Sequence, residues 1–94
     1  MVKIYTDAYE LIGKTPILRL AKIEQANGLK AKLFAKLEYF NLTGSVKDRV
    51  ALNMISDAEK SGKLKKGSVI IEPTSGNTGI GIAAVGTSKG YRVI

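Results

Sequence analysis

The clearest hydrophobic pattern in the chain predicts an amphipathic helix that begins shortly after Ser45. Apolar residues recur there at the three- and four-residue spacing that places side chains on one face of a helix. These apolar positions are Val46, Val50, Ala51, Met54, Ile55 and Ala58. Charged residues occupy the other faces, and Ser61-Gly62 provides a stop signal. Lys47 is therefore expected in the first turn of this helix.

Shorter apolar runs on both sides of this helix predict strands. Four strands are expected, over residues 17–20, 32–38, 69–71 and 91–94. The run at 69–71 is uniformly apolar, which is typical of a buried parallel strand. Helical segments are expected at 7–11, before Gly13, and at 80–89, before Gly90. Because strands alternate with helices, we expect an α/β fold with an open, mostly parallel sheet and flanking helices.

Composition narrows the chemistry that such a fold could carry. Of the 94 residues, 45% are hydrophobic and 24% are charged, which suits a folded chain with a thin core. The absence of cysteine and histidine excludes disulfides, Ser-His-Asp and Cys-His catalysis, and thiol or imidazole metal sites, so no metal is expected. No signal peptide and no apolar run of about 18 residues is found. We therefore expect a cytoplasmic protein without a membrane partner.

The net charge of +7 raises nucleic acid as an alternative partner. The lysines are scattered along the chain, however, and their only tight cluster lies at Lys60, Lys63, Lys65 and Lys66. No aromatic residue is interleaved with this cluster, as a stacking platform for single strands requires. No nucleic acid partner is expected, and a basic, non-catalytic binding module remains the alternative function of a different class.

A turn rich in hydrogen-bond donors follows the strand at 69–71. Open α/β sheets bind ligands at the carboxyl ends of their strands, and a helix start offers N–H groups to an anion. Gly76 and Gly79 allow close approach to the backbone. Short polar side chains that could grip a carboxylate or a phosphate come from Thr74, Ser75, Asn77 and Thr78. The alternative is an ordinary helix start, in which Ser75 or Asn77 only caps backbone donors.

Lys47 provides the second candidate site. A cation in the first turn of a helix lies beside the positive end of the helix dipole, where it is disfavoured. This position and desolvation both favour the neutral amine, which is the form that attacks a carbonyl carbon. Asp48 and Arg49 are expected to pair with other groups. The alternative is a surface lysine on a short helix, because most lysines are exposed.

Three motifs resemble the cysteine synthase, or O-acetylserine sulfhydrylase, family. They are I-G-K-T-P-I-L-R-L at 12–20, G-S-V-K-D-R at 44–49 and E-P-T-S-G-N-T-G-I-G at 72–81, and the resemblance extends over all 94 residues. It implies the tryptophan synthase β-subunit fold and the cofactor pyridoxal 5′-phosphate, with Lys47 holding the cofactor as a Schiff base. The residues implied to hold the substrate carboxylate are Thr74, Ser75, Gly76, Asn77 and Thr78. Asn77 is also implied to lie against the 3′-oxygen of the cofactor.

By this resemblance, the parent enzyme makes L-cysteine from O-acetyl-L-serine and sulfide by β-replacement. A sister enzyme, such as a cystathionine β-synthase or a cysteine lyase, is the alternative within the same chemistry. The resemblance further implies a homodimer and a serine acetyltransferase as a protein partner.

The chain differs from the family pattern in two respects. Family members are longer and have two domains, so we expect an N-terminal portion of such an enzyme, inactive alone. Residues 1–40 would supply strands of the larger domain, and residues 41–94 would begin the smaller, substrate-loop domain. The second difference is Leu42, which stands where the family usually has proline, and which is expected to loosen the turn before Lys47.

Overall fold

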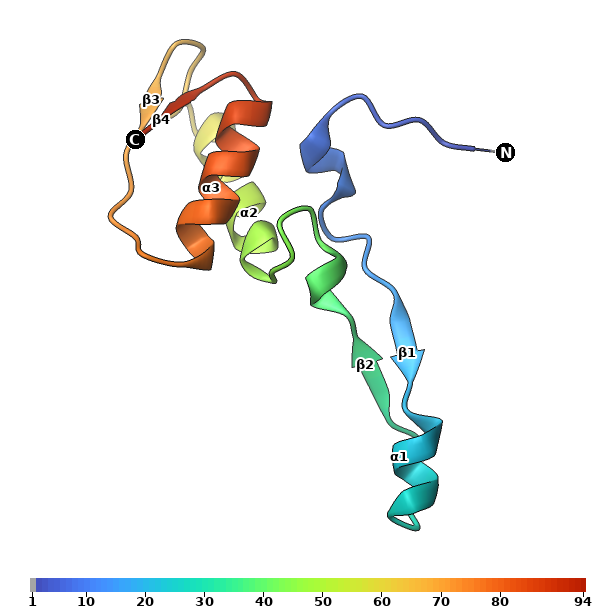
Figure 1. The fold of residues 1–94 in the computed structure, drawn as a ribbon. Helices are drawn as coiled ribbons and strands as arrows, with labels where there is room; N and C mark the ends of the chain where they lie inside the picture. Colours follow the sequence, from blue (N-terminus) through green and yellow to red (C-terminus); the bar gives the residue numbers. More distant parts are fainter. Residues whose placement is uncertain (1) are drawn as a thin grey trace.

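The fold consists of short helices and strands, as the computed structural model shows for residues 2–94 (Figure 1). In chain order, with η for a 3₁₀ helix, the elements are η1 (Ala8–Leu11), β1 (Ile17–Arg19), α1 (Ala21–Ala26), β2 (Phe34–Lys36), η2 (Glu38–Phe40), α2 (Lys47–Lys60), β3 (Val69–Ile70), α3 (Asn77–Ser88) and β4 (Arg92–Val93). The two long helices expected from the sequence are confirmed. The sequence pattern did not predict α1, where only the turn that follows it was expected.

The strands form two separate pairs of opposite direction. β1 and β2 are antiparallel, with Leu18 opposite Ala35, whereas β3 and β4 are parallel, with Val69 opposite Arg92. The expected α/β class is confirmed, but residues 2–94 form two two-stranded sheets in place of one open sheet. The connections explain the difference. The helix α3 provides the crossover that parallel pairing needs, whereas the chain after the short α1 reverses direction at the Asn27-Gly28 turn.

The hydrophobic core lies where η1, α2 and α3 meet. Its buried members are Ile12, Ala51, Ile55, Ile82 and Val85. Ala51 and Ile55 belong to the apolar face predicted for α2, whereas Val50 and Met54 of the same pattern are 38% and 42% exposed. The buried stripe of α2 is therefore narrower than its apolar pattern, because α3 is the main element packed against it.

Two glycines allow α3 to pack closely on its neighbours. A Cβ atom placed on Gly81 would lie 3.0 Å from the Lys47 carbonyl oxygen and 3.1 Å from Ala51 Cβ, at the contact with α2. A Cβ atom on Gly86 would lie 2.6 Å from Val93 Cγ2, at the contact with β4. The helix can lie this close to α2 and to the β3–β4 pair because these two positions have no side chain.

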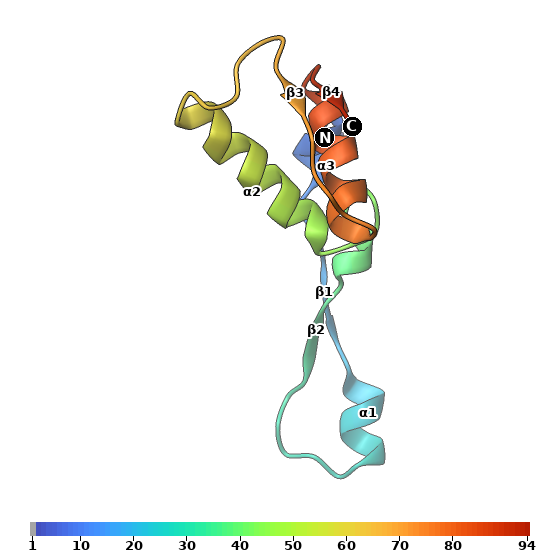
Figure 2. The ribbon, with the colours of Figure 1, turned by 90° about the vertical axis from the view of Figure 1, so that its left-hand side faces the viewer.

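The elements β1, α1 and β2 form an arm that projects away from the α2–α3 pair (Figures 1 and 2). The radius of gyration is 17.2 Å, compared with about 12 Å for a compact chain of this length. Large apolar side chains on the arm are exposed, among them Ile17, Leu18 and Phe34. No helix among the described residues is long and apolar enough to cross a membrane.

The β3–β4 pair is open on one face. The expectation of a buried strand at 69–71 is wrong, since Val69 is 46% and Ile71 is 70% exposed. Ile70 is half-buried, and its Cδ1 atom lies close to Gly86. Side chains alternate between the two faces of a strand, so α3 covers the face of Ile70 and leaves that of Val69 and Ile71 open.

At the base of the arm, the carboxylate of Glu38 joins three segments of the chain. It accepts hydrogen bonds from Arg49 Nε at 2.7 Å, Arg49 Nη2 at 3.0 Å, Thr15 Oγ1 at 2.7 Å and Asn41 Nδ2 at 2.8 Å. Arg49 also donates to the Gly13 carbonyl at 3.2 Å, and the Gly13 N–H donates to Asn41 Oδ1 at 2.8 Å. These five residues, the Glu38 cluster, tie the segment before β1 and the η2 turn to α2.

The Glu38 cluster predicts a specific dependence of stability on pH. The hydrogen bonds from Arg49, and then those from Thr15 and Asn41, lower the pKa of the Glu38 carboxyl from 4.5 to about 2. Between these values the unfolded chain binds a proton that the folded chain does not, so the free energy of unfolding should fall as the pH falls from about 5 toward 2. Denaturant unfolding at pH 6, 4 and 3 should show a shallower fall for Glu38→Gln. If the free energy of unfolding fell equally with pH in both proteins, Glu38 would not be the group responsible.

The close contact at Gly81 gives a second prediction. Gly81→Ala should lower the free energy of unfolding by about 1–3 kcal/mol, because the added methyl group must displace the Lys47 carbonyl or Ala51. Ala83→Ser adds one heavy atom to an exposed position of the same helix and should change stability by less than about 0.5 kcal/mol. Denaturant midpoints measure both. A Gly81→Ala protein as stable as the control would show that the helices have room for a side chain.

Candidate active site

Lys47 is the first residue of α2 and thus lies in the first turn, where the sequence predicts it. Its backbone N–H donates to Ser45 Oγ at 3.0 Å, so one of the donors that the start of a helix leaves unpaired is satisfied by a nearby side chain. The Lys47 side chain is exposed, and its amine takes part in no hydrogen bond or ion pair with the rest of residues 2–94. The desolvation expected from the sequence is therefore not provided by these residues, while the position at the helix start is confirmed.

The two residues after Lys47 are both held in place. Asp48 is fully buried, and its carboxylate accepts a hydrogen bond from the Thr43 backbone N–H at 2.6 Å and another from the Thr43 hydroxyl. Arg49 is bound in the Glu38 cluster. The expectation that Asp48 and Arg49 pair with other groups is confirmed. The backbone around Lys47 is thus anchored on both sides, and its amine remains accessible.

The turn before Lys47 is held without the usual proline. Leu42 is half-buried and packs against the hydrophobic core. Asn41 is buried, and its Nδ2 donates to the Ser45 carbonyl at 3.1 Å as well as to Glu38. Packing of Leu42 and the hydrogen bonds of Asn41 and Asp48 therefore restrain the turn, in place of the fixed backbone angle that proline would supply.

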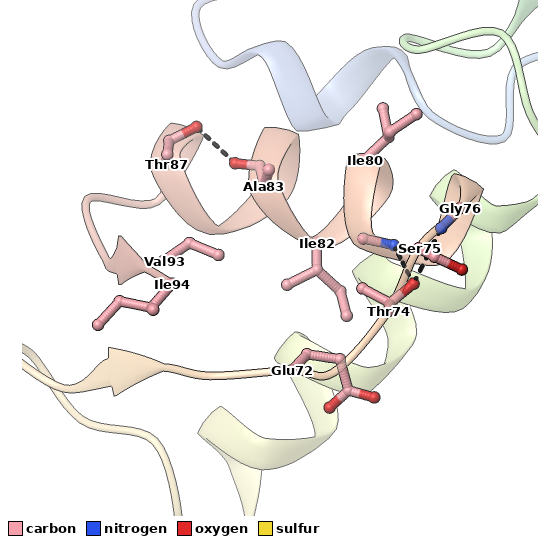
Figure 3. Close-up of a pocket in the computed structure, with 11 residues that line it drawn as sticks. Glu72, Thr74, Ser75, Gly76, Ile80, Ile82, Ala83, Thr87, Val93 and Ile94 are labelled. Atoms are coloured by element: carbon pink, nitrogen blue, oxygen red, sulfur yellow. Dashed lines mark hydrogen bonds between the residues drawn. The ribbon is translucent and has the colours of Figure 1, made fainter.

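The segment 74–79 spans the end of the loop before α3 and the first turn of that helix, which begins at Asn77, three residues before the expected start at Ile80. The Thr74 side chain satisfies backbone donors of this segment. Thr74 Oγ1 accepts hydrogen bonds from the Gly79 N–H at 3.2 Å and, at the longer distance of 3.4 Å, from the Gly76 N–H (Figure 3). Neither Ser75 nor Asn77 makes the capping bond that the simpler hypothesis required of it. Among residues 2–94, the backbone N–H groups of Ser75, Asn77 and Thr78 have no acceptor. The loop thus retains both side-chain and backbone donors for an anion.

A hollow of about 520 Å³ lies beside this loop (Figure 3). Glu72, Thr74, Ser75 and Gly76 line its polar part, and the apolar part includes Ile82, Ala83, Val93 and Ile94. Thr74 and Ser75 are exposed, so a small molecule could reach their hydroxyl groups from this side. Lys47 does not line the hollow. Its backbone is brought near the segment 74–79 by the packing of α2 on α3.

The starts of α2 and α3 lie at the same end of the helix pair (Figures 1 and 2). The Lys47 carbonyl oxygen lies against Gly81, as the 3.0 Å distance from a Cβ placed there shows. Gly81 follows Asn77 by four residues, which is about 6 Å along a helix axis. The Lys47 backbone and the donor loop are therefore separated by about one helical turn, although they are far apart in sequence.

Sequence reasoning did not identify several residues that support this arrangement. Glu38 fell at the end of a predicted strand, and no local pattern links it to Arg49. Asn41 was expected only as a turn residue, and Thr15 only as the residue before a proline. Gly81 is part of the third motif, but its contact with α2 depends on tertiary packing. The one signal present in the sequence is that Thr15 and Gly81 lie within the first and third motifs and that Asn41 lies three residues before the second.

Comparison with known proteins identifies the family. A model of the pyridoxal-phosphate dependent enzyme family matches residues 8–94. Cystathionine beta-synthase from Mus musculus is 58% identical over 92 residues, which is 98% of this chain and 16% of the mouse protein. A probable cysteine synthase from Bacillus subtilis is 53% identical over 94 residues, which is 100% of this chain and 30% of the bacterial protein.

Solved structures agree with the sequence comparison. The crystal structure of a cysteine synthase from Entamoeba histolytica matches with a TM-score of 0.86 and 46% identity over 97% of this chain and 28% of its own. The chain thus spans less than a third of the length of these relatives. The expected fold class and the expected cofactor of the family are confirmed. The chain belongs to the pyridoxal-phosphate dependent enzymes.

Proposed function

We propose that the whole protein makes L-cysteine from O-acetyl-L-serine and sulfide by β-replacement. The observation that carries this proposal is that the backbone of Lys47, whose side chain is exposed, lies about one helical turn from a segment of anion donors, at one end of the α2–α3 pair. An amino acid substrate needs both, because its carboxylate must be held while chemistry occurs at its carbon atoms. The similarity to cysteine synthases supports the choice of reaction.

The residues present fit pyridoxal phosphate in the chemistry of their donors. The Lys47 amine is exposed and unpaired among the described residues, as an amine must be to form a Schiff base with an aldehyde. When bound, the cofactor would accept the electron pair left on the substrate α-carbon when its proton leaves. Lys47 Nζ would accept that proton as the general base.

The loop would orient the substrate through its carboxylate. The Thr74 hydroxyl accepts the Gly79 N–H at 3.2 Å, and its own proton remains available to donate to a carboxylate oxygen. Ser75, Asn77 and Thr78 would add their side chains and undonated N–H groups, and Gly76 would allow the carboxylate to approach the backbone. Asn77 would in addition contact the 3′-oxygen of the cofactor.

A cystathionine β-synthase is the second candidate, because the mouse enzyme of that name is 58% identical to this chain. Both candidates would use Lys47 and the loop in the same way, and they differ in the sulfur nucleophile. Product analysis with sulfide and with homocysteine, each offered with O-acetylserine and with serine, separates them. The division at residue 40, homodimer formation and binding of a serine acetyltransferase remain predictions from the family resemblance.

The role of Lys47 can be tested by chemical trapping. Borohydride reduction of the protein loaded with pyridoxal phosphate should leave the pyridoxyl group on Lys47, and peptide mass mapping would locate it. Lys47→Ala should abolish the Schiff-base absorbance. Label on any of the other eleven lysines would contradict the assignment. Absence of the pyridoxyl group from every lysine of the protein, Lys47 included, would contradict the proposed function itself.

The role of the loop can be tested by separating substrate affinity from cofactor content. Ser75→Ala and Thr78→Ala should each weaken amino acid binding by about 1–3 kcal/mol, the value of a hydrogen bond to a charged group. Titration of the cofactor absorbance with O-acetylserine measures this affinity. Ser61→Ala is the matched control, because this exposed hydroxyl lies just after the end of α2, away from the helix starts, and donates to the Ala58 carbonyl at 3.2 Å. Loss of cofactor with unchanged substrate affinity would show that the loop binds the cofactor phosphate.

A further inference from the structure

We propose that the Glu38–Arg49 ion pair is a positioning device for Lys47, an inference that rests on the proposed role of Lys47 as the Schiff-base lysine. Neither residue contacts the Lys47 amine in the structure. Their effect is on the backbone that carries it, which they hold through hydrogen bonds that reach the chain both before and after Lys47. Glu38 and Arg49 are therefore positioning residues.

The path from Glu38 to the chain before Lys47 is continuous. Glu38 Oε2 accepts a hydrogen bond from Asn41 Nδ2 at 2.8 Å, and the same amide donates to the Ser45 carbonyl at 3.1 Å. Ser45 Oγ then accepts the Lys47 N–H at 3.0 Å. Asn41 and Ser45 are both buried, so water competes little for these bonds.

The path to the chain after Lys47 is a direct ion pair. Arg49 lies two residues further along the first turn of α2, and it places two N–H groups on the Glu38 carboxylate at 2.7 and 3.0 Å. A two-point contact of this kind fixes orientation as well as distance. Arg49 also reaches the Gly13 carbonyl and Thr15 Oγ1, at 3.2 and 3.1 Å, so the pair cannot rotate freely about a single bond.

A single carboxylate thus restrains the backbone on both sides of a side chain that is itself unrestrained. Such an arrangement suits a lysine whose amine must change its bonding partner during a reaction. The amine has to move, and the point from which it moves has to stay fixed, because a displacement of about 1 Å is costly in a reacting geometry.

The arm contains a matched control for this proposal. Arg19 and Glu24 form a second ion pair with two contacts, at 3.2 and 2.9 Å, and Glu24 also accepts the Leu33 N–H at 3.0 Å. This pair lies at the β1–α1 junction of the projecting arm, away from the start of α2 (Figure 1). Glu24→Gln therefore removes the same kind of interaction without touching the segment around Lys47.

The test measures how much of the bound cofactor is joined to Lys47. Full-length protein is saturated with pyridoxal phosphate, reduced with borohydride and mapped, and the Schiff-base absorbance is followed across pH. Glu38→Gln should lower the fraction joined to Lys47 by about 5- to 10-fold, whereas Glu24→Gln should stay within about twofold of the parent. On a free-energy scale, the double variant Glu38→Gln/Arg49→Gln should lose less than the sum of the two single variants, because both changes break the same ion pair.

Hydrogen exchange of the cofactor-free protein provides an independent readout. Amides at 43–49 should exchange faster in Glu38→Gln but not in Glu24→Gln. If Glu38→Gln fails to fold, Thr15→Val, which removes one hydroxyl and keeps the ion pair, should show a smaller effect in the same direction. Equal effects of the Glu38 and Glu24 changes would overturn the positioning role while leaving Lys47 as the attachment site. Absence of label on Lys47 in the parent protein would overturn both the positioning role and the assignment of Lys47 as the attachment site.

Discussion

The close packing of α2 on α3 is the contact on which the rest of this structure depends. At Gly81 the two helices approach so closely that a Cβ atom would lie 3.0 Å from the Lys47 carbonyl oxygen. The contact places the starts of both helices at one end of the pair (Figures 1 and 2). It also buries Ala51 and Val85, which are both 0% exposed, at the centre of a small core. The same α2–α3 contact therefore forms the core and sets the positions of the two helix starts.

Outside this core, polar contacts restrain the chain. The base of the arm is held by the Glu38 carboxylate, which accepts four hydrogen bonds from Arg49, Thr15 and Asn41. Several directional hydrogen bonds on one carboxylate specify geometry even where their net contribution to stability is modest. The buried Asp48 does the same for the turn at Thr43.

The sequence pattern predicted those features of the structure that depend on residues close together in the chain. The periodicity of apolar residues predicted α2 correctly, with Lys47 in its first turn. The donor-rich segment at 74–79 was found because helix starts have unpaired N–H groups whatever the rest of the fold. The antiparallel pairing of β1 with β2 and the link between Glu38 and Arg49 were not predictable in this way. Both depend on which distant segments meet. The exposure of Ile71 is of the same kind, because a uniformly apolar run does not reveal which of its faces is covered.

The two helix starts also differ in how their positive ends are compensated. The first turn of α2 contains Asp48, whose buried carboxylate already offsets the partial positive charge of that helix end. The first turn of α3 contains no acidic residue, and three N–H groups in and before it have no acceptor within residues 2–94. A carboxylate from outside the chain is thus favoured at α3 and not at α2. This asymmetry supports the proposed binding of a substrate carboxylate at the segment 74–79, beside the start of α3.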